Sequence, residues 1–167
     1  TRMKQLSPMM LANLVLALLV ISLLAFEQLT RPTPAGEPLT TQSPNAVQEI
    51  RVLRGDTLKF ALLRDADGWM MTHPEVSRAR TARVSHLLSL LGARSSLTLP
   101  LDNRKLADFG LLQPILEIQF DELTLRFGNE SAPPGRRYLA IDDRISLIDE
   151  AYFRIAGLPA KHYRESD

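Results

Sequence analysis

The sequence predicts an α+β fold, in which an N-terminal transmembrane helix precedes one small extracytoplasmic domain of antiparallel strands with two or three helices. Two observations carry this prediction. Residues 9–26 form an uncharged, apolar run near the N-terminus. After residue 48, short apolar segments alternate with turn residues, and only a few of them have helical spacing. Strands that follow one another without intervening helices favour antiparallel pairing, so the predicted class is α+β.

Length and composition narrow the function classes. The chain has 167 residues, of which 45% are hydrophobic and 23% charged, as in a folded protein. Its net charge of +1 provides no field that would attract nucleic acid. The chain has no Cys, which excludes disulfides, thiolate metal sites and a cysteine nucleophile.

The apolar run 9–26 is predicted to cross the membrane once. It would span about 27 Å as a helix, close to the hydrocarbon thickness of about 30 Å. Arg2 and Lys4 precede it, and a net negative flank follows, so residues 1–8 are expected in the cytoplasm and the rest of the chain in the periplasm of a bacterial inner membrane. A cleaved signal peptide is the competing interpretation, disfavoured by the length of the run and the lack of a nearby small-x-small site.

Three residues in this run are candidates for packing against another membrane helix: Asn13, Ala17 and Ser22. Small residues allow two helices to approach closely, and an amide can form a hydrogen bond between helices. Lipid headgroups could equally solvate Asn13, which lies near the cytoplasmic end. Both interpretations of Asn13 stay open at this point.

Residues 27–48 are predicted to be a tether, since four prolines lie among Thr, Ser and Gln without an apolar period. Proline fixes φ and lacks a backbone donor, which keeps such a segment extended. The alternative is that the segment lies ordered along a partner. The extracytoplasmic domain is expected to occupy residues 49–167.

Within that domain, each element follows from apolar spacing and from the turn residues that bound it. Alternating segments with turn residues between them predict strands, whereas spacing of three and four residues predicts helices. Gly92, Gly110 and Gly157 are natural helix ends, and Asp149 is a natural helix cap. The expected strands are 49–55, 56–64, 69–72, 96–99, 115–120, 123–127, 138–141 and 145–148, and the expected helices are 74–91, 104–109 and 150–156. The expected core residues are Trp69, Leu87, Leu91, Phe109, Ile118, Leu125, Tyr138 and Leu147.

Short motifs in the second half are shared with a known family. They are Phe109-Gly110-Leu111 followed by Pro114, then Phe127-Gly128, then Tyr138-Leu139 and the strand 145–148 before a helix. Together with the membrane helix, the Pro-rich segment and Trp69, they make the chain resemble the bacterial membrane-anchored domain-of-unknown-function family forty-three-forty. That family is similar to auxiliary components of ABC-type export and gliding systems. The resemblance implies a non-enzymatic envelope partner and carries over no functional residues.

The residues themselves predict no catalytic, cofactor or metal site. The three histidines, His73, His86 and His162, lack the close spacing of metal ligands. Residues 65–68 resemble the start of a calcium loop but lack its later acidic ligands, and a hairpin turn explains them better. Turn and helix-cap roles explain the carboxylates at 142, 143, 149 and 150.

Five arginines are candidates for a partner surface: Arg78, Arg80, Arg83, Arg136 and Arg137. An anionic partner or lipid could bind there, while the alternative is an ordinary solvated face. The sequence therefore predicts a non-catalytic accessory or scaffold subunit of a larger inner-membrane complex, with the membrane and other subunits as partners and with neither nucleic acid nor a small-molecule substrate. The alternative function is a periplasmic binding module for a small envelope ligand, such as a glycan or a lipid headgroup.

Overall fold

The computed structural model describes residues 9, 13, 16–20, 22 and 36–165. The chain divides into two units, 1–34 and 35–167. In the first unit, the described residues are helical and exposed. No helix among the described residues is long and apolar enough to cross a membrane. Much of the segment 9–26, and all of 1–8, lies outside the described residues, so the transmembrane helix stays a prediction.

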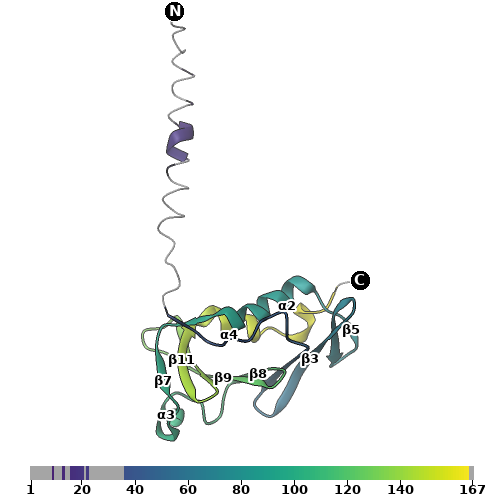
Figure 1. Cartoon of the computed structure of the whole chain (residues 1–167), viewed down its shortest axis with the longest axis vertical. Coiled ribbons are helices and arrows are strands. Elements are labelled where there is room, and N and C mark those ends of the chain that lie inside the picture. The colour runs from purple at the N-terminus through teal and green to yellow at the C-terminus, as the bar shows by residue number, and fades with distance from the viewer. Residues whose placement is uncertain (1–8, 10–12, 14–15, 21, 23–35, 166–167) are drawn as a thin grey trace, which may run out of the picture. The chain divides into compact units, whose positions relative to one another are not determined.

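The second unit is built on a nine-stranded antiparallel sheet, so the α+β class is confirmed (Figure 1). Its order is β5-β4-β3-β2-β8-β9-β10-β11-β7, and a separate pair joins β1 to β6. The strands are β1 Glu37–Pro38, β2 Glu49–Arg54, β3 Thr57–Asp65, β4 Gly68–His73, β5 Ser77–Arg78, β6 Arg94–Ser95, β7 Thr98–Pro100, β8 Leu116–Phe120, β9 Leu123–Glu130, β10 Arg136–Ile141 and β11 Arg144–Asp149.

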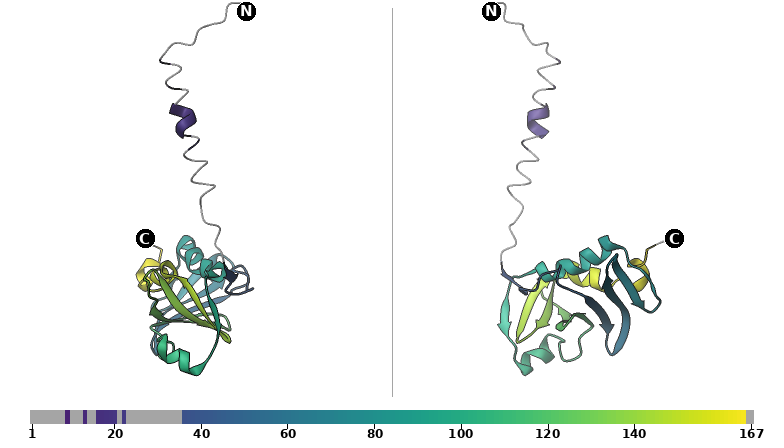
Figure 2. Two further views of the ribbon diagram at one scale, coloured as in Figure 1. Left: turned by 90° about the vertical axis from the view of Figure 1, so that its left-hand side faces the viewer. Right: turned by 45° about the vertical axis from the view of Figure 1, so that its right-hand side comes forward.

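Helices cover the two faces of the sheet unequally (Figure 2). Helices α2 (Thr81–Leu88) and α4 (Glu150–Ala156) pack against one face and share one large core with it. The 3₁₀ turns η1 (Ser89–Gly92) and η2 (Ala160–His162) follow these helices in the chain. Helix α3 (Asn103–Asp108) contributes to a smaller core over β10 and β11. Over β2, β3 and β4 the uncovered face carries exposed side chains such as Arg51, Leu63 and Thr72.

The sheet contains a topological repeat. Four strands and a helix, β2 to β5 with α2, are followed later by four strands and a helix, β8 to β11 with α4. Each set of four strands is a meander, and the two meanders meet at the β2–β8 pair, where Val52 lies opposite Ile118. From the β2–β8 pair outward in either direction, the strands therefore follow one another in their order along the chain. Only β7, at one end, departs from this pattern.

Tight turns define the register of the hairpins. Those at Asp121 and Asp142 were predicted from the sequence, whereas Gly55 was placed at the end of the expected strand 49–55. Gly55, Asp121 and Asp142 each begin a two-residue turn with a positive φ, of 55°, 53° and 49° respectively. Glycine adopts such angles without strain, and Asp tolerates them better than most residues do. The Asp121 carboxylate also accepts the backbone N–H groups of Gln48 and Glu49, at 3.0 and 2.8 Å. This turn therefore also fixes the start of β2.

The tether prediction is wrong for residues 36–48, because this segment packs on the domain. Leu39 and Val47 are 1% and 0% exposed and belong to the large core. The Leu39 N–H donates to the Ala93 carbonyl at 3.0 Å, next to the β1–β6 pair. Leu39 and Val47 are isolated apolar residues in a Pro-rich segment and form no helical or strand period. The sequence pattern therefore did not reveal their burial. Residues 27–35 of the predicted tether lie outside the described residues.

The predicted helix 74–91 begins later than expected, at Thr81. The chain turns after His73, and Ser77 and Arg78 then pair with β4 as β5. The Arg78 guanidinium donates to the Asp65 carboxylate at 2.8 Å, and this hydrogen bond is the main reason that the pKa of Asp65 lies below its ordinary value. Val76, which the helical spacing had placed on the core side, is 73% exposed. The short strand therefore replaces the first two turns of the expected helix.

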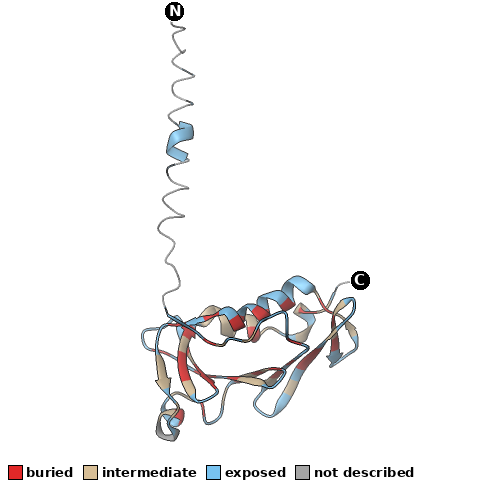
Figure 3. Ribbon diagram, viewed as in Figure 1, coloured by how far each residue is buried: buried red, intermediate tan, exposed pale blue. Residues whose placement is uncertain are grey.

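Five of the eight predicted core residues are buried, which confirms that part of the prediction. Buried positions lie on both strands and helices of the domain (Figure 3). Phe109, Tyr138 and Leu147 are half-buried instead. Phe109 stacks on Tyr138 with ring centroids 4.1 Å apart, over the face that only α3 and its flanking segments cover. The thinner cover on that side explains their partial exposure. The buried residues are Trp69, Leu87, Leu91, Ile118 and Leu125.

The two glycine motifs of the second half pack against each other. The Asn129 N–H donates to the Phe109 carbonyl at 2.7 Å, and a Cβ atom at Gly128 would lie 2.2 Å from the same carbonyl oxygen. That oxygen belongs to the backbone and cannot rotate away. Gly128 is therefore required by a close approach of two backbone segments.

Replacing Gly128 by Ala should lower the free energy of unfolding by about 1–3 kcal/mol, since the methyl group forces two packed segments apart. Denaturant titration followed by the fluorescence of Trp69, the single tryptophan, measures this change. Gly92→Ala is the matched control, because a Cβ there meets nothing within 4 Å. Equal stabilities of the two variants would contradict the close-approach explanation.

Candidate functional site

Strand β7 is one of the two edge strands of the nine-stranded sheet, and β5 is the other. On its inner side β7 pairs with β11, and the Leu147 N–H donates to the Leu97 carbonyl at 2.9 Å while the Leu101 N–H donates to Asp143 at 2.7 Å. Backbone groups of an antiparallel strand point alternately to its two sides, so those of Thr98 and Pro100 face outward. Within the described residues no strand pairs with this outer side. The backbone of Thr98 therefore offers a donor and an acceptor, and Pro100 offers an acceptor only.

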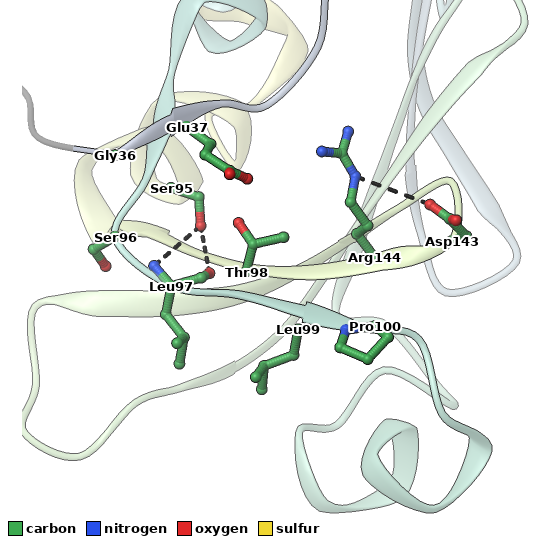
Figure 4. A pocket seen from close by; sticks show the side chains of 10 residues that line it. All are labelled: Gly36, Glu37, Ser95, Ser96, Leu97, Thr98, Leu99, Pro100, Asp143 and Arg144. Atoms are coloured by element: carbon green, nitrogen blue, oxygen red, sulfur yellow. Dashed lines mark hydrogen bonds and ion pairs between the residues drawn. The ribbon is translucent and has the colours of Figure 1, made fainter.

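A hollow of about 540 Å³ lies beside this edge (Figure 4). The Ser95 hydroxyl donates to the Leu97 carbonyl and accepts the N–H of Leu147 at 3.1 Å, which bends the chain between β6 and β7. In Figure 4 the side chains of Glu37 and Thr98 extend toward each other across the hollow. Leu97 is 45% exposed beside them. The lining residues are Gly36, Glu37, Ser95, Ser96, Leu97, Thr98, Leu99, Pro100, Asp143 and Arg144.

A second hollow, of about 450 Å³, shares Glu37 and Arg144 with the first. The Arg144 guanidinium donates to the Leu39 carbonyl at 3.3 Å and lies 3.9 Å from the Asp143 carboxylate. This side chain therefore borders both hollows and connects them to the N-terminal segment. The remaining lining residues are Pro38, Thr40, Thr41 and Asp142.

The chemistry of this edge suits recognition of a peptide. Hydroxyl groups, one guanidinium and two carboxylates surround a strand edge to which no other described strand pairs, and an extended peptide could add hydrogen bonds there. His73, His86 and His162 lie elsewhere, in β4, α2 and η2. Among the residues that the structure describes, no group of three or more His, Asp or Glu side chains could hold a metal ion.

Asn13, Ala17 and Ser22, the predicted helix-packing residues, are described as helical and exposed. At about 100° per residue, Ala17 follows Asn13 on nearly the same side of a helix, whereas Ser22 comes about 180° from Asn13. One helix face therefore cannot present all three. A neighbouring helix that contacts Asn13 and Ala17 would leave Ser22 on the far side.

Arg137 is not part of a partner surface, contrary to the prediction, because it is 7% exposed. Its Nε and Nη2 atoms donate to the two Glu150 oxygens at 2.7 and 2.8 Å. Its Nη1 donates to the Gly128 carbonyl at 2.6 Å, and its guanidinium lies 3.8 Å from the centroid of the Phe153 ring. All three guanidinium nitrogens of Arg137 thus donate hydrogen bonds within the domain. The strand pattern around Tyr138 had not shown that Arg137 points to the core.

The other four arginines do not form one surface. Arg78 on β5 is bound to Asp65 and Asp67, at 2.8 and 3.2 Å. Arg136 is exposed on β10, and five strands separate β5 from β10 in the sheet. At about 4.8 Å per strand this separation is about 29 Å. Arg80 and Arg83 lie near Arg78 at the start of α2, half-buried and exposed respectively.

Glu37, Thr98 and Arg144 were not predicted as site residues from the sequence. Glu37 was assigned to the tether, Thr98 was placed in the expected strand 96–99, and Arg144 was given no functional role. One signal was present, because Pro100 directly follows the apolar alternation of residues 96–99. Proline within a strand is largely confined to edges, so it could have marked β7 as the end of the sheet.

Comparisons of this chain with family models, with curated proteins and with solved structures found no match. The resemblance to the domain-of-unknown-function family forty-three-forty therefore stays a prediction. The function has to be argued from the fold and from the β7 edge.

Proposed function

We propose that this chain is a non-catalytic accessory or scaffold subunit of a larger bacterial inner-membrane complex. Its domain, in the periplasm, binds an extended segment of a neighbouring subunit along β7. The observation that carries the proposal is the outer side of β7, with which no strand in the described part of the chain pairs, beside a hollow of about 540 Å³. Exposed strand edges readily accept another strand, and backbone hydrogen bonds supply the affinity.

The membrane anchor in this proposal rests on the sequence of residues 9–26. The run is uncharged, and the basic residues that precede it favour a cytoplasmic N-terminus. A single-pass anchor would hold the domain near the membrane subunits of the complex. Such tethering raises the effective concentration of the domain near its partner, which compensates for the low affinity of a short contact.

The β1–β6 pair supports a short strand as the bound element. Strand β6 directly precedes β7 in the chain, and its two residues, Arg94 and Ser95, already pair with β1. Pro100 lacks a backbone donor, which limits further pairing to the stretch around Thr98. The expected contact is therefore a few residues long, with the exposed Leu97 side chain beside it.

Two substitutions at one position test the proposal. Thr98→Pro removes the outward N–H while the inner pairing with β11 stays intact, and Thr98→Val keeps that N–H in a residue that suits strands. Full-length protein is purified in mild detergent, and the chains that elute with it are identified. We expect a subunit to elute with the wild type and with Thr98→Val, and to be reduced about tenfold or more with Thr98→Pro.

A photoreactive amino acid placed at position 97 should cross-link to that same subunit, whereas one placed at Leu63, on the uncovered face of the sheet, should not. A reporter that works only outside the cytoplasm should be active when fused after Asp167. A chain that elutes alone, or a partner that Thr98→Pro retains fully, would refute the proposed contact. An inactive reporter would refute the orientation.

A further inference from the structure

A separate pocket of about 320 Å³ lies between the central strands and the chain after α4. It is on the helix-covered side of the sheet, away from β7. Its floor is formed by Val52, Leu116 and Ala156, each 1% exposed. Leu158, Pro159 and Ala160 form the opposite wall. A mostly apolar pocket with few polar groups is the usual form of a small-ligand site, and this volume is at the small end of that range.

Among the residues that the structure describes, the charged residues that line this pocket are two cations, Arg54 from β2 and Lys59 from β3. Both side chains are exposed, and within the described part of the chain neither has a hydrogen-bond or ion-pair partner. The Arg54 Nη2 atom comes within 3.8 Å of where a Cβ atom on Gly157 would lie, so the guanidinium lies beside the Gly157 backbone, which also lines the pocket. The described lining residues include no carboxylate that would neutralise the two charges.

The wall of the pocket is held in place by the C-terminal segment. The Tyr163 hydroxyl donates to the Ile155 carbonyl at 2.7 Å, and its ring packs on Phe60 with centroids 4.6 Å apart. Burial raises the pKa of Tyr163 to about 12. The segment from Leu158 to Ala160 is thus held between α4 and a buried aromatic side chain.

We propose that this pocket binds a single-chain alkyl anion, with its phosphate or carboxylate head between Arg54 and Lys59 and its first methylene groups against Val52 and Leu116. Unpaired cations at the mouth complement an anionic head, and the apolar floor complements the chain. The volume suits one short alkyl segment rather than two chains. This inference concerns a surface other than β7 and does not depend on the proposed function.

Calorimetric titration of the full-length protein in phosphatidylcholine nanodiscs tests the inference, with empty nanodiscs as the reference. The probes are octyl phosphate and octanoate, and the controls are inorganic phosphate and octyltrimethylammonium. We expect the two alkyl anions to bind at least tenfold more tightly than inorganic phosphate, and the alkyl cation not to bind. The anion that binds with the higher affinity identifies whether the head group of the natural ligand is a phosphate or a carboxylate.

The double variant Arg54→Gln and Lys59→Gln should weaken binding of the preferred anion by tenfold or more. Arg51→Gln is the matched control, since Arg51 lies on the same strand but does not line the pocket. Ala160→Phe should block alkyl binding by filling the pocket while both cations remain. Equal affinities of the wild type and the double variant, or inorganic phosphate binding as tightly as octyl phosphate, would overturn the proposal.

Discussion

Replacing Arg137 by Met should lower the free energy of unfolding by about 3–5 kcal/mol, because removal of one partner leaves the other charge of a buried ion pair uncompensated. Arg137 and Glu150 have side chains that are 9% and 17% exposed and are joined by two hydrogen bonds. The substitution also leaves the Gly128 carbonyl without its donor. Denaturant titration followed by Trp69 fluorescence measures the loss.

Arg136→Met is the control for this experiment, because Arg136 is the preceding residue and is exposed. A surface substitution of this kind should change the free energy of unfolding by no more than about 0.5 kcal/mol. Adding Glu150→Met to Arg137→Met should regain part of the lost free energy of unfolding, since it removes the Glu150 carboxylate that Arg137→Met leaves without a partner. If Arg137→Met is no more destabilising than Arg136→Met, the ion pair does not stabilise the domain.

Leu87→Ala should cost about 2–5 kcal/mol of unfolding free energy, because it removes a side chain that is 1% exposed and leaves a cavity. Leu87 lies on α2 and packs in the large core with the sheet. The same titration applies. Leu112→Ala removes the same atoms from a side chain that is 63% exposed, so it should cost less than about 1 kcal/mol. A similar loss in both variants would mean that α2 is not packed as the structure shows.

Eight of the eleven strands in the described part of the domain could be predicted because local chemistry specifies them, whereas the two-residue strands β1, β5 and β6 were not predicted. The turns at Gly55, Asp121 and Asp142 require a residue that tolerates a positive φ, and each has one. Asp149 accepts the Ala151 N–H at 2.7 Å, which confirms the predicted cap of the last helix. The order of the strands could not be predicted in this way. The pairing of β2 with β8, and the place of β7 at the edge, depend on contacts between residues far apart in the sequence.

The candidate site was harder to predict than the fold for a physical reason. Apolar spacing identifies which side of an element is buried, whereas polar side chains are placed by partners elsewhere in the chain. Arg137 is buried because the β10–β11 register brings Glu150 next to it, 13 residues later. Glu37 borders the hollow because β1 pairs with β6, across 58 residues from Glu37 to Ser95 by their numbering. Neither pairing has a local sequence signal.

The repeat of four strands and a helix has a consequence for how the domain folds. Within each half, every strand pairs with the strand next to it in the chain, and only the β2–β8 pair joins the two meanders within the nine-stranded sheet. Neighbouring hairpins close short loops, and such local contacts form fast. The central pairing closes a much longer loop, so it is expected to be the slow step. Two preformed halves would then dock along one seam, and substitutions at Val52 or Ile118 would retard folding more than substitutions in the outer hairpins.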